Sequence, residues 1–205
     1  MIREKSVLKT NLVKRYLLFA LGLLVFGIGI SFGNKSLFGG NPMSVFVVGV
    51  KNHLDLSMGT CNLIVAAFEI VMGYLLDKSN VSIASIFGMI CGSYAIDFGN
   101  LLISDSNNIY VRIIYMLVGI VCYCFGLAMQ QYGHVGLGNL DCLNFGLKKA
   151  FKIKKYHTIK WIVDAVFIIA GYMLGAPVGV GTVLLLAFAG LIIEQFKEAV
   201  KKLLG

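Results

Sequence analysis

A short apolar stretch interrupted by glycine occurs twice in the chain, at residues 39–51 and 136–148. In each copy, glycine and asparagine come before a run of mostly apolar residues, and a lysine ends the run. A membrane-crossing helix needs about 20 apolar residues, so each copy is about half as long as a crossing. Short, glycine-interrupted apolar segments at matching positions of two halves indicate the binding site of a secondary transporter.

The composition indicates an integral membrane protein. Of the 205 residues, 58% are hydrophobic and 14% are charged, and the mean hydropathy is +0.84. A soluble domain is about half apolar and a quarter charged, so this chain has too few polar residues to cover a water-facing exterior. The net charge of +8 lies mainly where apolar runs end, which is typical of loops beside an anionic leaflet. We therefore expect contact with the lipid bilayer and none with nucleic acid.

Six longer apolar runs predict six transmembrane helices. They are expected at residues 16–33, 58–76, 83–104, 109–129, 158–174 and in a last run that ends near residue 196. If the N-terminus is cytoplasmic, every lysine and arginine except Lys35, Lys51 and Arg112 falls on the cytoplasmic side. The positive-inside rule therefore predicts a multi-pass protein of the bacterial cytoplasmic membrane with both termini in the cytoplasm.

The fold class that follows is an all-α membrane protein with six transmembrane helices and two short helices, at residues 42–52 and 139–151. The short helices are expected to be interrupted or re-entrant, because they are too short to cross. They also begin at glycine and asparagine, which favour a loop followed by a helix N-cap.

Matching residues at an offset of 97 or 98 positions predict an internal duplication. Examples are Gly22 with Gly119, Gly29 with Gly126, and Gly73-Tyr74 with Gly171-Tyr172. Three crossings per half is an odd number, so the second half must be inverted in the membrane. The predicted units are a basic N-terminus (1–15), a first repeat (16–104), a linker (105–108), a second repeat (109–197) and a cytoplasmic tail (198–205).

The order of these features resembles the YczE/YyaS/YitT-type bacterial membrane proteins. The resemblance covers residues 16–196, and its clearest marks are residues 39–49, 136–146 and the Pro-Val-Gly-Val-Gly-Thr run at 177–182. Members typically carry Pro-x-Asp at the start of each short helix. This chain has Pro42 with Ser44 in one copy and Asn139 with Asp141 in the other. The resemblance implies a polytopic membrane fold and no agreed activity.

Carboxylates inside predicted spans are candidates for ion or proton coupling. Glu69 lies in the second predicted span and Asp164 in the fifth. A charge facing lipid is costly, so such residues normally face the interior of the helix bundle. For Glu69 the alternative is a structural hydrogen bond between helices. For Asp164 the alternative is a simple ion pair with nearby lysines.

The starts of the two short helices are candidate substrate contacts. A helix start presents unpaired N–H groups and a partial positive charge. Asn41 is a predicted N-cap before Pro42, whereas Asp141 lies in the first turn of its helix and would neutralise that end. We therefore predict a site for a small anionic or zwitterionic solute formed by Asn41, Ser44, Asp141 and Asn144, with ordinary capping as the alternative for Ser44 and Asp141.

The function predicted from the sequence is a small secondary transporter or exporter with a site near the bilayer midplane. The alternative is a membrane accessory or regulatory subunit that binds another protein and does not transport. No catalytic or metal-ligand constellation is evident, so neither enzymatic activity nor a cofactor or metal is expected. The expected partner is a small-molecule substrate, and a homodimer is left open.

Overall fold

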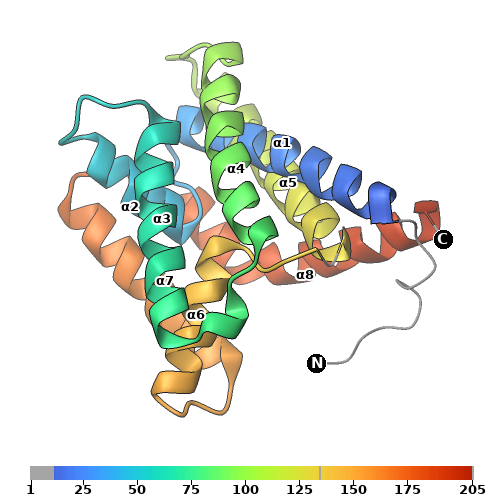
Figure 1. Cartoon of the computed structure of the whole chain (residues 1–205). Coiled ribbons are helices and arrows are strands. Elements are labelled where there is room, and N and C mark those ends of the chain that lie inside the picture. The colour runs from blue at the N-terminus through green and yellow to red at the C-terminus, as the bar shows by residue number, and fades with distance from the viewer. Residues whose placement is uncertain (1–11, 134, 205) are drawn as a thin grey trace.

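The structure, a computed structural model, describes residues 12–133 and 135–204, and all regular structure in these residues is helical. Residues 1–11 of the predicted basic N-terminus lie outside this part. The α-helices are α1 (Leu12–Ser36), α2 (Pro42–Lys51), α3 (Met58–Leu76), α4 (Ile83–Leu102), α5 (Ile109–Gly133), α6 (Asn139–Ala150), α7 (Tyr156–Met173) and α8 (Val180–Leu204). A single 3-10 turn, η2 (Lys78–Asn80), joins α3 to α4 (Figure 1).

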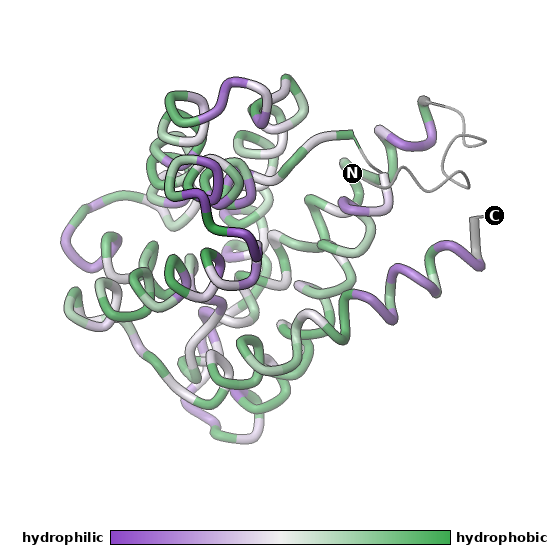
Figure 2. The backbone as a smooth tube through the Cα atoms, turned by 90° about the horizontal axis from the view of Figure 1, so that it is seen from below, coloured by the Kyte–Doolittle hydropathy of each residue, from purple (hydrophilic) through white to green (hydrophobic). Residues whose placement is uncertain are grey.

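Five of these helices, α1, α3, α4, α5 and α8, are long and apolar enough to cross a membrane. The sixth predicted crossing is α7, which has 18 residues, contains Lys160 and Asp164, and is not among these five. The two short helices α2 and α6 have 10 and 12 residues. Hydrophobic residues dominate the long helices, and hydrophilic residues gather in loops and in the last turns of α8 (Figure 2). The predicted all-α class with six long and two short helices is confirmed.

Helices α1 and α5 cross at glycines. A Cβ atom on Gly126 would lie 2.7 Å from the carbonyl oxygen of Gly22, and one on Gly119 would lie 3.1 Å from the carbonyl oxygen of Gly29. Such close backbone approach is typical of small-residue interfaces between membrane helices. The two contacts join equivalent positions, because Gly22 matches Gly119 and Gly29 matches Gly126 in the sequence.

Each short helix packs on a long helix from the other half of the chain: α2 on α7, and α6 on α3. A Cβ atom on Gly49 of α2 would lie 2.9 Å from the carbonyl oxygen of Gly171, and one on Gly146 of α6 would lie 3.3 Å from that of Gly73. These four glycines again occupy matching positions at an offset of 97 or 98. Helices α4 and α8 instead pack within their own halves, α4 on α1 and α8 on α5.

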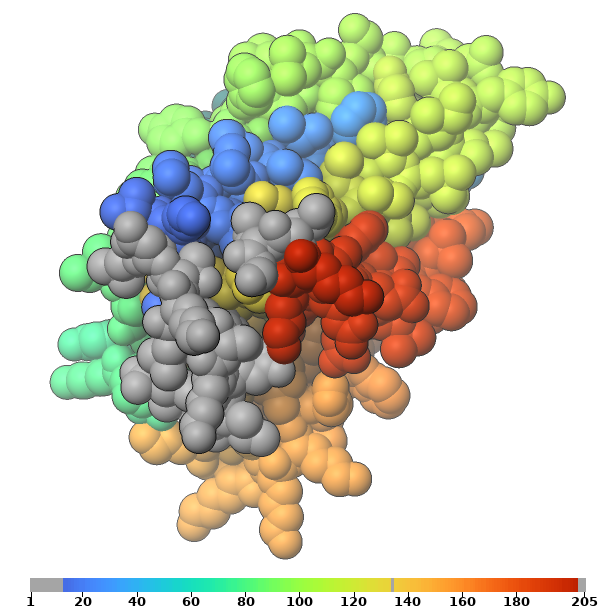
Figure 3. All heavy atoms as spheres, turned by 90° about the vertical axis from the view of Figure 1, so that its right-hand side faces the viewer, coloured from blue at the N-terminus to red at the C-terminus, as the bar shows by residue number. Residues whose placement is uncertain are grey.

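The beginning of α1 and the end of α8 lie on the same side of the molecule (Figures 1 and 3). Leu18 of α1 packs there against a buried cluster of Met129, Tyr132 and Val200 from α5 and α8. An even number of crossings requires this arrangement. Which side of the membrane these ends face remains the prediction drawn from the lysine distribution.

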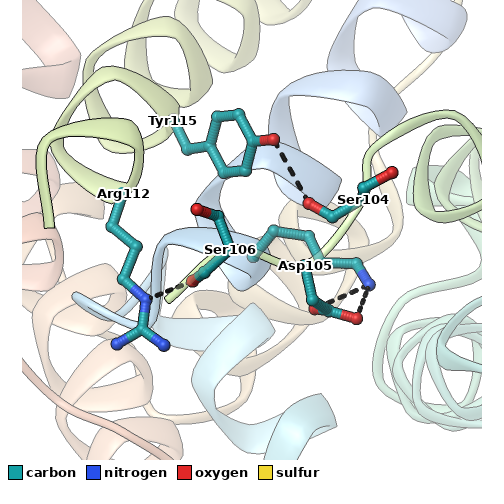
Figure 4. A network of polar contacts seen from close by, with 6 residues as sticks. Ser104, Asp105, Ser106, Arg112 and Tyr115 are labelled. Atoms are coloured by element: carbon teal, nitrogen blue, oxygen red, sulfur yellow. Dashed lines mark hydrogen bonds and ion pairs between the residues drawn. The ribbon is translucent and has the colours of Figure 1, made fainter. Parts of the chain in front are cut away.

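The segment predicted as the linker between the halves is held by polar contacts (Figure 4). Lys35 Nζ, at the end of α1, lies 2.9 Å from both carboxylate oxygens of Asp105. Arg112 Nε donates to the Ser106 carbonyl oxygen over 2.7 Å, and Tyr115 Oη donates to that of Ser104 over 3.2 Å. The linker is therefore fixed to both α1 and α5.

The glycine crossing predicts a strong effect of a single methyl group. Gly126→Ala should destabilise the protein by about 1–3 kcal/mol, because the new Cβ would overlap the α1 backbone. Gly190→Ala on α8 is the matched control, since a Cβ there meets nothing within 4 Å. The control should be neutral or slightly stabilising, because alanine favours a helix over glycine. Unfolding in detergent micelles measures both, and equal stability of the two variants would contradict the proposed crossing.

Candidate functional site

A buried carboxylate on α3 meets the start of α6. Asn139, the first residue of α6, donates a hydrogen bond through Nδ2 to Oε2 of Glu69. The Glu69 side chain is fully buried. The same Nδ2 atom lies 3.7 Å from Sδ of Met43 on α2, so the starts of the two short helices are close together. The N-cap of α6 is Gly138, which has no capping side chain, and this leaves Asn139 free to bond across to α3.

The first turn of α6 also contacts the start of α7. Tyr156 Oη donates a hydrogen bond to Oδ1 of Asp141 and lies 3.5 Å from Nδ2 of Asn144. Asn144 is completely buried. Asp141 interacts electrostatically with both Lys160 and Asp164 on α7. The structure therefore brings the predicted residues Asp141 and Asn144 together, between α3 and α7.

Asp164 forms an ion pair within its own helix. Its Oδ2 lies 2.5 Å from Nζ of Lys160, one turn earlier on α7. The Asp164 side chain is 3% exposed and that of Lys160 is 41% exposed. The charge of Asp164 is thus already compensated, as the ion-pair alternative for this residue predicts.

Three buried oxygen atoms near the start of α6 have no hydrogen-bond partner in the described part of the chain. They are Glu69 Oε1, Asn144 Oδ1 and Asp164 Oδ1. Buried polar groups are normally paired, so a cluster of unpaired acceptors requires an explanation, such as a proton, water or ligand. All three atoms would be satisfied by a hydrogen-bond donor.

A second polar group surrounds the start of α2. Asn41 is the N-cap, and its Oδ1 accepts a hydrogen bond from the Ser44 backbone N–H over 3.0 Å. Ser44 Oγ donates to Oδ1 of Asn34 over 2.9 Å, and Asn34 Nδ2 is buried without a partner in residues 12–133 and 135–204. The predicted capping is therefore present. Among the described residues, the two short helices are joined near their starts by the hydrogen bond of 3.7 Å from Asn139 Nδ2 to Sδ of Met43.

Two cavities open at opposite ends of α3. The first has a volume of about 690 Å³, is lined by Asn34, Lys51, Met58 and Asp97 among others, and adjoins a smaller void lined by Asn41, Ser44 and Tyr123. The second has a volume of about 480 Å³ and is lined by Asp77, Asn80, Phe145, Lys148, Lys149, Lys152, Ile153 and Lys154. Glu69 lies between them, about 16 Å along the helix from Met58 and about 10 Å from Leu76.

Equivalent contacts tie each short helix to its long partner beside these cavities. Lys149, at the end of α6, lies 2.9 Å from the Asp77 carboxylate at the end of α3. At the matching place in the other half, Asn52 Nδ2 donates to the carbonyl oxygens of Gly175 and Leu174 over 3.1 and 3.4 Å. One tether is an ion pair and the other consists of neutral hydrogen bonds.

Sequence reasoning missed Tyr156, Lys160 and Asn34 as site residues. The spacing of Lys160 and Asp164 by four residues is a readable signal for an ion pair on one helix face. The roles of Tyr156 and Asn34 depend on which helices pack together, and local sequence carries no signal for that.

Comparison with known proteins places the chain among membrane proteins. A profile of DUF6198, a family of unknown function, matches residues 13–198. The chain belongs to this family. It is 25% identical to an uncharacterized protein of Haemophilus influenzae over 91% of this chain and 84% of the relative. It is 24% identical to the uncharacterized membrane protein YczE of Bacillus subtilis, over 91% and 87% of the two chains. It is 19% identical to YyaS of the same bacterium, over 92% and 94%.

These matches confirm the resemblance noted in the sequence, and with it the assignment as a membrane protein. They cover nearly the whole chain, so they include both short helices of this DUF6198 member. No solved structure matches the chain.

The bond between Asn139 and Glu69 predicts strong coupling between these residues. Asn139→Leu should destabilise the protein by about 1–3 kcal/mol, because it leaves the buried carboxylate without its donor. Combining it with Glu69→Met removes the stranded group as well and should restore most of the lost stability. Unfolding of the two single variants and the double variant in micelles measures the coupling. Simply additive losses would show that the two side chains do not interact.

The ion pair of Asp77 predicts a pH-dependent stability. The hydrogen bond from Lys149, helped by Ser79, lowers the pKa of the Asp77 carboxyl below its ordinary value. A lowered pKa in the folded state means that the stabilisation is complete above about pH 4 and is lost as the pH falls through the folded-state pKa. Wild type should therefore exceed Asp77→Asn in thermal stability at neutral pH, and the difference should shrink in acid. A difference that is unchanged at low pH would contradict this role.

Proposed function

We propose that the chain is a small secondary transporter that moves a small polar solute through a site between two inverted three-helix halves. The observation that carries the proposal is the incompletely paired polar group around Glu69, Asp141 and Asn144. This group is buried midway along α3, between cavities at the two ends of that helix. Buried polar groups at such depth mark solute or proton pathways in membrane proteins.

The recurring contacts support the inverted repeat. Glycine crossings, the seating of each short helix and the tethers at their ends all occur twice, at positions offset by 97 or 98 residues. With three crossings in each half, the two copies run in opposite directions through the membrane. Transporters with this design bind their substrate where discontinuous helices meet at the repeat interface.

The unpartnered atoms favour a zwitterionic solute. The group at the start of α2 has a free donor, Asn34 Nδ2, next to a helix end with partial positive charge. The group at the start of α6 has free acceptors, Glu69 Oε1 and Asn144 Oδ1. A solute with a carboxylate at one end and an ammonium group at the other would satisfy both groups, with the carboxylate toward Asn34, Asn41 and Ser44.

Glu69 is the proposed proton carrier. It is fully buried and has no cationic partner among the described residues, whereas Asp164 is paired with Lys160. A carboxyl group in this position can gain a proton when a path to it opens from one side and lose it when a path opens from the other. Asp164 then contributes mainly by holding Lys160 near Asp141.

The cavity of about 690 Å³ also favours transport over the alternative of an accessory subunit. A protein that only binds a partner in the membrane needs no large cavity leading toward buried polar residues. The membrane location is supported by the five long apolar helices and by the YczE relative. The bacterial cytoplasmic membrane, with both termini in the cytoplasm, is part of the proposal.

A proton-flux assay tests this function. The purified protein is reconstituted into vesicles that contain a pH-sensitive dye, and zwitterionic amino acids, monocarboxylates and amines are added in turn. Amino acids should evoke a proton flux with the wild type. Glu69→Gln should reduce the initial rate at least about tenfold, because glutamine keeps the hydrogen-bonding shape and cannot carry the proton.

Glu198→Gln provides the matched control, because this glutamate is exposed near the end of α8. It should leave the flux unchanged. Undiminished solute-evoked flux in Glu69→Gln would remove Glu69 from the mechanism. If no solute class evokes a flux or exchanges across the vesicle membrane, the transport proposal is wrong.

A further inference from the structure

We propose that the cavity between the end of α3 and the end of α6 is a binding site for a phosphate-bearing anion, separate from the solute site. We call it the lysine pocket. It is lined by Asp77, Asn80, Phe145, Lys148, Lys149, Lys152, Ile153 and Lys154 and has a volume of about 480 Å³. This size suits a phosphate compound or the head group of a lipid.

The lysine pocket has a large excess of positive charge. Four of its eight lining residues are lysines, and the single acidic residue, Asp77, is occupied by Lys149. The end of α6 contributes only about half a negative charge. The cavity at the other end of α3 is different, because its Lys35 pairs with Asp105 and its Lys51 faces a lining that includes Asp97. The surplus of positive charge is therefore a property of the lysine pocket and not of both cavities.

One of these lysines, Lys152, has a strained backbone conformation. Lys152 has a φ of +54°, in the left-handed region. It closes the end of α6 through hydrogen bonds from Lys152 N to the Lys149 carbonyl oxygen (3.2 Å) and from Ile153 N to that of Lys148 (3.0 Å). Glycine is the usual residue at this point of such a turn, because it adopts the conformation without strain. Lysine here costs stability and adds a cation to the pocket wall, which is typical of strain kept for function.

An unpartnered donor in the same wall points to an acceptor ligand. Asn80 Nδ2 is buried and has no hydrogen-bond partner in the part of the chain that the structure describes, and Asn80 lines the pocket. Phosphate oxygens accept hydrogen bonds from amide and ammonium groups alike, and a phosphate monoester carries up to two negative charges. Three lysines that have no carboxylate partner among the described residues, together with one amide donor, match such a group.

Two kinds of molecule can supply the phosphate group: a soluble phosphate compound or the head group of an anionic lipid. Basic pockets at helix ends on the cytoplasmic side bind anionic head groups. The lysine pocket lies at the side that the lysine distribution predicts to be cytoplasmic. The experiment therefore has one arm for each source.

The first arm measures binding of pyrophosphate to the full chain in an uncharged detergent, by calorimetry and thermal unfolding, against chloride at equal ionic strength. The second compares thermal unfolding in phosphatidylcholine bilayers with and without phosphatidylglycerol. Stabilisation in the first arm identifies a soluble phosphate ligand, and stabilisation in the second alone identifies a lipid head group. Either result supports the site.

Three variants make the test specific. Lys148→Gln/Lys152→Gln/Lys154→Gln should weaken binding at least about tenfold, since it removes the unpaired cations. Lys155→Gln is the control, because this exposed neighbour does not line the pocket. Lys152→Gly should raise the unfolding temperature without ligand and still weaken binding, which separates a ligand role from a folding role.

Glu69→Gln should bind the anion as the wild type does, so failure of the transport proposal leaves this site testable. The proposal is overturned if neither anion source stabilises the protein beyond chloride. It is equally overturned if the triple variant and Lys152→Gly respond as strongly as the wild type.

Discussion

Helices α2 and α6 begin within a protein that is surrounded by lipid, where no solvent can satisfy a broken backbone. Each break must therefore be covered by protein, and the helix that each short helix contacts most comes from the other half of the chain. The backbone of α2 lies against α7 at Gly49 and Gly171, and that of α6 lies against α3 at Gly73 and Gly146. At the first break, the Phe38 carbonyl oxygen accepts a hydrogen bond of 2.9 Å from Gly181 N.

The packing of each short helix on a long helix of the other half also creates the polar site. Because α6 is seated on α3, Asn139 meets Glu69, and because α7 follows directly, Tyr156 meets Asp141. The residues of the proposed site therefore come from both halves of the chain and lie where the two halves meet. Any movement of one half against the other would change the surroundings of Glu69. A buried carboxyl whose surroundings change with conformation is the requirement for coupling a proton to transport.

Hydropathy and length predicted most of the fold, and the second predicted span, 58–76, agrees with α3 to the residue. The ends of α1 and α8 extend beyond the predicted runs. Basic residues continue both helices past the apolar part, because long charged side chains can reach out of the membrane. For the site, Asn41, Ser44, Asp141 and Asn144 were predicted as one substrate site, with Glu69 and Asp164 as coupling residues. Asp141 and Asn144 lie on α6, whose first residue, Asn139, bonds to Glu69. Asn41 and Ser44 lie in a separate group, because hydropathy does not say which half covers which helix.

The two tethers show how related halves can acquire different behaviour. The hydrogen bonds of Asn52 to Leu174 and Gly175 are neutral, so salt and pH have little effect on them. The matching contact, Lys149 with Asp77, is an ion pair whose lysine side chain is 65% exposed, so salt screens it and an anion competes for it. An anion in the lysine pocket would draw Lys149 away from Asp77 and loosen α6 from α3 at that end only. Since Asn139 of α6 also bonds to Glu69, an anion in the pocket would change the surroundings of the buried carboxylate as well.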